Sequence, residues 1–188
     1  VSGTAGNPIT YIGDYLGTNT DGVGGVVRIS GAAANEQSAS RANCILASTA
    51  RAYRTFQGFL LDTTSGSQIS AAGTGCDHWI IDQCVFAENP SVTVWSISFS
   101  GASQSTNTIK RCVFLPQLGG IINFTHSAVV DNSAHAVENC LVIGSVVASG
   151  TIRFDRVGGV TIKNSYFTAC TNTIRVFTAL TVGQTVTV

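Results

Sequence analysis

The charged segment "RFDR" carries the residues best suited to acid–base chemistry. Arg153 and Arg156 would place two guanidinium groups beside the carboxylate of Asp155. If the segment is a strand, alternation puts Arg153 and Asp155 on one face, where an acid–base pair could act. The interpretation we favour is an exposed ion-pair patch, which is common on protein surfaces.

Other polar residues in expected loops and strands are candidates for binding. The substrate-binding candidates are Asp77, His78, Asp131 and Arg175. No set of equivalent positions gathers three carboxylates, as a calcium site would need, so we predict no metal site. His126 and His135 flank one loop with no nucleophile between them, and we expect both at the surface.

Six cysteines raise the question of metal binding or disulfides. Their spacing lacks the paired C-x₂₋₄-C pattern of a zinc site. Cys84, Cys112 and Cys140 fit better as stacked small apolar residues. One bridge among Cys44, Cys76 and Cys170 stays open, because sequence alone cannot assign a pairing.

A repeated sequence template indicates where all of these residues lie in the fold. Segments such as "TIKRCVF" and "TIKNSYF" share an apolar residue, two polar or small ones, a Cys or its substitute, any residue, and an apolar residue. Repeats of 20–50 residues are typical of solenoids. Steps of 25, 28, 28 and 25 residues separate the members of the structural stack: Phe59, Cys84, Cys112, Cys140 and Ser165.

The residues around this column predict the fold. The position two residues before it alternates in charge, through Asp82, Lys110, Glu138 and Lys163, which favours opposite charges as neighbours in a parallel stack. Second strands rich in β-branched residues lie between the templates. We therefore predict an all-β, right-handed parallel β-helix of about six coils with a 25–28-residue period. Residues 1–188 would form a single domain, as a fragment of a longer chain or a repeating assembly subunit.

Composition excludes several classes of function. Ten basic residues balance ten acidic ones, and charged residues make up only 11% of the chain. Nucleic-acid binding would need a basic patch, and membrane insertion a run of about 18 apolar residues. We therefore expect neither partner.

The opening "SGTAGNPITYIGD" and the repeated "TIKNSYF" and "TIKRCVF" resemble the coils of the pectate-lyase-like right-handed parallel β-helix superfamily. The resemblance covers nearly the whole chain. That superfamily includes polysaccharide lyases as well as tailspikes and surface fibres, so it is specific for a fold and not for an activity. For a lyase, the resemblance implies a Brønsted base, for which Arg153, Asp155 and Arg156 are the candidates, and Ca²⁺ as a cofactor.

Two departures from that superfamily guide the functional expectation. "VSGTAG" begins directly in coil-like sequence and "TALTVGQTVTV" continues a strand pattern, both without a polar cap. Bare solenoid ends expose strand edges, so we expect self-association or neighbouring domains there. We predict a non-catalytic structural module of an extracellular, cell-surface or virion-associated fibre, needing no cofactor. The alternatives are a lyase or glycoside hydrolase acting on an acidic polysaccharide, and a carbohydrate-binding adhesin.

Overall fold

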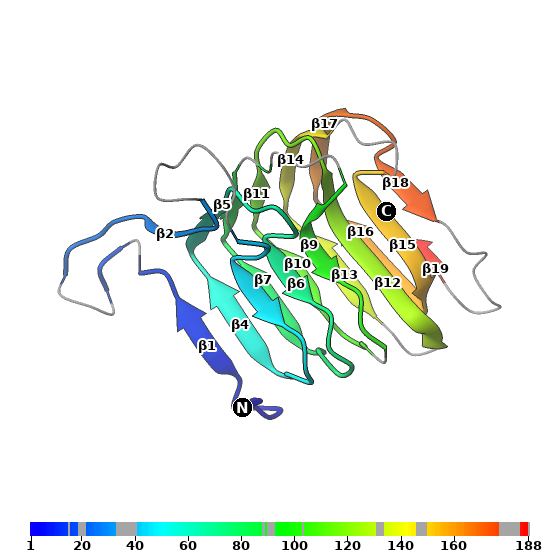
Figure 1. The fold of residues 1–188 in the computed structure, drawn as a ribbon, viewed down its shortest axis with the longest axis horizontal. Helices are drawn as coiled ribbons and strands as arrows, with labels where there is room; N and C mark the ends of the chain where they lie inside the picture. Colours follow the sequence, from blue (N-terminus) through cyan, green and yellow to red (C-terminus); the bar gives the residue numbers. More distant parts are fainter. Residues whose placement is uncertain are drawn as a thin grey trace.

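Three parallel β-sheets wrap the chain into a solenoid in the computed structural model (Figure 1). The structure describes residues 1–14, 16–18, 22–32, 41–87, 89, 93–102, 104–130, 134–145, 150–176 and 185–187. Every strand pairing between named strands in these ranges is parallel, and each strand pairs with its equivalent in the next coil. The chain is therefore an all-β parallel β-helix, as the repeats predict.

Each coil contributes one strand to each sheet. The first sheet contains β1 (Ile9–Ile12), β4 (Arg54–Gln57), β7 (Trp79–Asp82), β10 (Thr108–Lys110), β13 (His135–Glu138), β16 (Gly159–Lys163) and β19 (Thr185–Thr187). The second contains β2 (Val27–Ser30), β5 (Phe59–Asp62), β8 (Val85–Phe86), β11 (Val113–Phe114), β14 (Leu141–Ser145) and β17 (Tyr166–Cys170). The third contains β3 (Ile45–Ala47), β6 (Ile69–Ala71), β9 (Trp95–Phe99), β12 (Gly120–Val130), β15 (Ile152–Val157) and β18 (Ile174–Val176).

The regular part of the solenoid makes about four turns at a period close to 28 residues. The register joins Phe56, Ile81, Ile109, Val137 and Ile162, separated by 25, 28, 28 and 25 residues. This count of regular turns differs slightly from the six coils expected, although the second and third sheets each contain six strands. Tyr11 pairs with Phe56, 45 residues later, because the first turn carries longer connections between its strands.

A tight corner joins the first sheet to the second in each regular coil. The residue before each member of the structural stack has a positive φ, between 51° and 76°. These residues are Gly58, Gln83, Arg111, Asn139 and Asn164. This left-handed conformation turns the chain sharply. The next side chain donates to the carbonyl two residues before it, as in Cys112 to Lys110 at 3.3 Å and Ser165 to Lys163 at 3.1 Å. Small side chains suit this position because they bond inside the corner.

The stack expected from the sequence follows this corner. Phe59, Cys84, Cys112 and Cys140 are buried, and Ser165 is partly exposed. All six cysteines are free thiols, so none of the pairings left open forms here. Burial raises the pKa of the Cys44 thiol to about 11, despite a hydrogen bond to Asp62 that acts the other way. Such a thiol stays protonated and unreactive at neutral pH.

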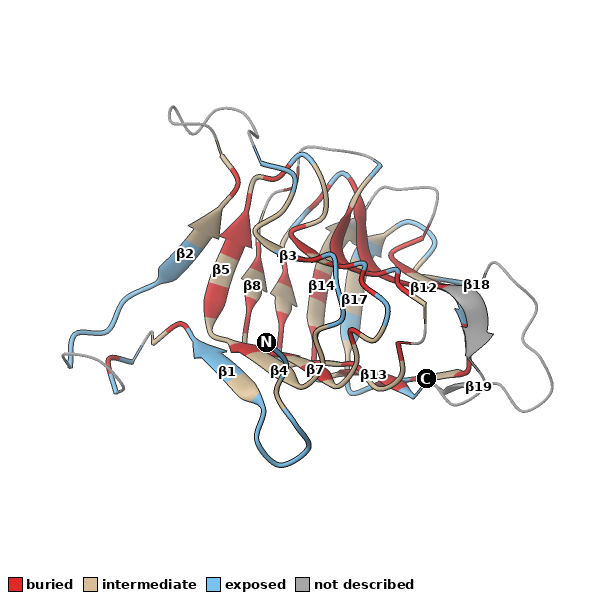
Figure 2. Ribbon diagram, turned by 60° about the horizontal axis from the view of Figure 1, so that its bottom comes forward, coloured by how far each residue is buried: buried red, intermediate tan, exposed pale blue. Residues whose placement is uncertain are grey.

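Aromatic and aliphatic side chains stack along the inside of the coils. Phe86 and Phe114 lie 4.7 Å apart, and Phe99 and Phe124 lie 5.5 Å apart, with nearly parallel rings in each pair. Figure 2 shows the buried residues concentrated on the stacked strands, whereas β1 and much of β2 are exposed. Apolar burial of this kind is the main favourable contribution to folding.

The alternating charges form ion pairs between coils. Lys163 Nζ lies 3.0 Å from Glu138 Oε1, and Lys110 Nζ lies 3.7 Å from Asp82 Oδ2. Arg111 also pairs with Asp82, whose side chain is only 6% exposed. Asp82 is therefore more buried than a freely solvated outer position would be, because Arg111 and Lys110 cover it.

Candidate functional site

The outer face of the second sheet carries an unbroken column of apolar side chains. Its members occupy equivalent positions in successive coils and are Leu60, Val85, Val113, Leu141 and Tyr166. The first four are partly exposed, and Tyr166 is 65% exposed. Outward positions of a surface sheet are ordinarily polar. We call this row the outer apolar column.

A second apolar row lies beside the first. Ala87, Leu115 and Ile143 stand two residues after members of the outer apolar column and are also partly exposed. Backbone hydrogen bonds from Ala87 N to Leu61 O and from Leu115 N to Phe86 O extend the parallel pairing to these positions. Together the two rows form a continuous apolar surface, a feature that marks interaction sites on soluble proteins.

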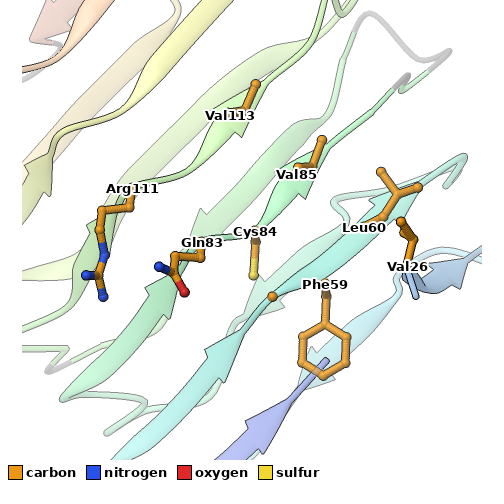
Figure 3. A pocket seen from close by; sticks show the side chains of 9 residues that line it. Val26, Phe59, Leu60, Gln83, Cys84, Val85, Arg111 and Val113 are labelled. Carbon is orange, nitrogen blue, oxygen red and sulfur yellow. The ribbon is translucent and has the colours of Figure 1, made fainter. Parts of the chain in front are cut away.

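A groove of about 490 Å³ opens on this surface (Figure 3). Leu60, Val85 and Val113 point to one side of the strands, while Phe59 and Cys84 point to the other. Val26, which is 73% exposed, lines one end of the groove. The groove thus has an apolar floor built from three successive coils.

The corner residues Gln83 and Arg111 supply the polar rim. Arg111 Nε donates to Asp82 Oδ1 at 2.8 Å, and its Nη2 donates to the other carboxylate oxygen. Gln83 Oε1 accepts from Gln57 Nε2 at 2.9 Å. The rim guanidinium is therefore already neutralised by a carboxylate of the preceding coil, and the groove is suited to apolar contact more than to binding a charged ligand.

The "RFDR" residues come together on β15 as an ion-pair cluster. Arg153 Nη2 lies 3.3 Å from Asp155 Oδ2, and Arg156 Nε lies 3.9 Å from Asp155 Oδ1. Arg175 on β18 is in register with Arg153. The arrangement is that of the ion-pair patch that the sequence favours, with Asp155 between two guanidinium groups.

Asp77 and His78 lie at a different place on the solenoid. His78 Nδ1 is 3.5 Å from Asp77 Oδ1, Ser105 Oγ donates to Asp77 Oδ2, and the His78 ring stacks on Tyr53 at 4.3 Å. They precede β7, whereas Arg156 precedes β16, three coils further on. At about 4.8 Å per coil the two groups are roughly 14 Å apart, so they do not form one site. Asp131 lies outside the described residues.

The two histidines expected at the surface are in fact buried, so that expectation is wrong. His126 and His135 are each 1% exposed, and their Nε2 atoms lie 3.3 Å apart. His135 follows the inward alternation of β13, and its ring stacks on Phe124 at 4.4 Å. A loop between two histidines does not show which way each strand faces, whereas the register with Val160 would have indicated an inward position.

Sequence reasoning also missed the outer apolar column. The repeated template treats the position after the Cys as any residue, although it is apolar or aromatic in all five repeats. Reading that position as a column would have predicted an apolar outer face.

Metal clusters, membrane spans and related proteins add few further limits on the function. In the described ranges, no three His, Cys, Asp or Glu side chains cluster so as to hold a metal ion. No helix in that part of the chain is long and apolar enough to cross a membrane. Comparison with protein-family models, curated proteins and solved structures found no match to this chain.

Proposed function

We propose that this chain is a non-catalytic structural β-helix module of an extracellular, cell-surface or virion-associated fibre. In this proposal it belongs with the pectate-lyase-like right-handed parallel β-helices that its coil sequences resemble. The observation that carries the proposal is the outer apolar column, which runs along five coils of the second sheet. A surface of this kind is costly in water unless a partner covers it.

The partner is a second copy of the chain. Successive strands of a parallel sheet lie about 4.8 Å apart, so two copies present apolar rows of the same spacing. Two such faces can pack as stacked sheets, at a separation of about 10 Å. A matched repeat on both surfaces gives contact at every coil.

The end strands of the first sheet support contacts along the fibre axis as well. Among the described residues, β1 and β19 each have one hydrogen-bonded neighbour and stand at opposite ends of the first sheet. In this proposal each of these strands pairs with a strand of a neighbouring copy, because strand edges offer N–H and C=O groups to another chain. Head-to-tail contact between unlike ends produces filaments when it does not close into a ring.

The polar outer face of the third sheet supports glycan contact as an accompanying role. Arg153 and Arg175 stand in register on β15 and β18. Guanidinium groups donate hydrogen bonds to hydroxyl and carboxylate oxygens. A panel of neutral and acidic polysaccharides tests this role, and retention of none of them would reject it.

Electron microscopy with sedimentation analysis tests the structural proposal. We expect filaments or defined oligomers, and we expect Val113→Asp to abolish lateral association by placing a carboxylate in the apolar face. Thr108→Asp is the matched control, because it puts the same charge on an outward position of the first sheet in the same coil. A wild-type chain that stays a 19.5 kDa monomer at high concentration would reject the proposal.

A further inference from the structure

A chain of hydrogen bonds crosses three coils inside the solenoid. The Trp79 backbone N–H donates to Asn107 Oδ1 at 2.9 Å, and the Asn107 backbone N–H donates to His135 Nδ1 at 3.3 Å. His135 Nε2 then lies 3.3 Å from His126 Nε2. Asn107, His135 and His126 are at most 1% exposed. Buried polar groups with so little solvent depend on these bonds.

The backbone donor at Asn107 fixes the protonation of both rings. Because His135 Nδ1 accepts a hydrogen bond, the neutral ring must carry its proton on Nε2. That Nε2–H then donates to His126 Nε2, which leaves the His126 proton on Nδ1. A metal ion bridging the two Nε2 atoms would need the opposite tautomer of His135, which would set Nδ1–H against the Asn107 N–H.

One donor at the end of the chain lacks a described partner. His126 Nδ1 is buried and has no hydrogen-bond partner among the described residues. A buried donor in this state destabilises the fold, and the cost depends on how the site is solvated. Among the described residues, therefore, only one arrangement of protons satisfies the hydrogen bonds of the pair.

We propose that His126 and His135 form an acid-sensitive latch between β12 and β13. A proton added to His126 Nε2 would face the Nε2–H of His135. A proton added to His135 Nδ1 would face the Asn107 N–H. Either event replaces a hydrogen bond with two opposed donors, so acid separates the two strands at this point. This inference does not rest on the proposed fibre function.

Among the described residues, the side chains packed against His135 carry no charge that would compensate a buried proton. His135 is packed by Phe124 of β12 and Phe99 of β9 and is in register with Val160 of β16. Below it stands Asn107, whose amide donates to the Cys76 carbonyl, and the Cys76 thiol is directed at Thr49 O. On β15 the charged groups are Arg153, Asp155 and Arg156, which pair with one another.

The direction of the pH effect follows from this burial. Burial lowers the pKa of His126 to about 4, and burial together with the charge of His126 lowers the pKa of His135 to about 3. An unfolded histidine has a pKa of about 6.5. The stability that the neutral pair contributes is therefore complete above about pH 6.5 and is lost as pH falls toward the folded values.

Urea unfolding between pH 8 and pH 4.5 tests the latch. We expect the wild-type folding constant to fall below pH 6.5 by roughly tenfold per pH unit for each imidazole that stays neutral. The double variant His126→Gln/His135→Asn keeps amide oxygens near the two acceptor positions and removes both titrating rings, so its profile should be flat where the wild type falls. His78→Gln removes the third histidine of the chain and should follow the wild type. Parallel profiles for wild type and double variant would overturn the inference.

Nuclear magnetic resonance of the wild-type chain gives a test that needs no variant. Two-bond ¹H–¹⁵N spectra at pH 7 should show His135 as the Nε2–H tautomer and His126 as the Nδ1–H tautomer. Both rings should remain neutral at pH 5.5. The opposite tautomer at either ring, or titration of either ring near pH 6.5, would overturn the latch.

Discussion

The second and third sheets have six strands each and similar inner faces, but their outer faces differ in chemistry. Inside, Phe86 stacks on Phe114 in the second sheet, and Phe99 stacks on Phe124 in the third. Outside, the second sheet carries the outer apolar column. The third carries Ser70, Ser98, Asn123, Arg153 and Arg175 in register. The inner faces of both sheets fill the interior of the coils and are therefore similar. The outer faces are not bound by this requirement and differ according to what covers them.

The polar residues on the outer face of the third sheet are also more buried and more hydrogen-bonded within the fold than the outer apolar column. Ser98 and Asn123 are only 7% and 6% exposed. Asn123 Nδ2 donates to Ser98 Oγ at 3.2 Å, and Thr125 Oγ1 donates to Asn123 Oδ1 at 2.7 Å. Within the described part of the chain, no comparable contact covers the exposed area of the outer apolar column. This difference supports a role in contacts with a second chain for the apolar face.

The largest expected effect tests what the two sheets share. Phe114→Ala and Phe124→Ala each remove a fully buried ring, and we expect each to lower the free energy of unfolding by about 3–5 kcal/mol. Urea unfolding followed by circular dichroism measures both. Tyr166→Ala, at an exposed ring, is the control and should cost far less. A loss below about 1 kcal/mol at either phenylalanine would show that the two inner faces are not equivalent.

The next effect separates the outer faces. Asn123→Ala leaves the Ser98 and Thr125 hydroxyls without their amide partner, and we expect a loss of about 1–3 kcal/mol. Val85→Thr is the matched change on the apolar face, where a partly exposed methyl becomes a hydroxyl. It should change stability by no more than about 0.5 kcal/mol. Equal effects in urea unfolding would contradict the difference in integration between the two faces.

The repeats predicted much of the fold because the inner position must be filled by an apolar side chain in every coil. Ile81, Ile109 and Val137 must fill equivalent places in the stack, so their spacing is visible in the chain. The corner was visible as a break in alternation, although the left-handed conformation at Gln83 and Arg111 was not. Neither residue type signals a positive φ, since the tight turn imposes it.

The candidate sites were harder to predict because no packing requirement fixes the residue type at outer positions. Leu60 and Tyr166 differ in size and type, and only the register shows that they belong to one face. His135 was misplaced for a related reason: it is the first residue of β13, and its real environment is Phe124 of β12 and Asn107 of the preceding coil. Residues that touch between coils are far apart in the sequence, so a local sequence pattern does not predict their contacts.

The smallest expected effect concerns the ion-pair cluster on the polar face. Arg153→Ala and Asp155→Ala, made singly and together, should give a coupling energy of about 0.2–1 kcal/mol, because the Arg153 side chain is 27% exposed and water screens the pair. Assembly of the double variant in electron microscopy should match the wild type, since the cluster lies away from the apolar face. A coupling energy above about 2 kcal/mol, or loss of assembly, would place this cluster in an interface and reverse the roles assigned to the two outer faces.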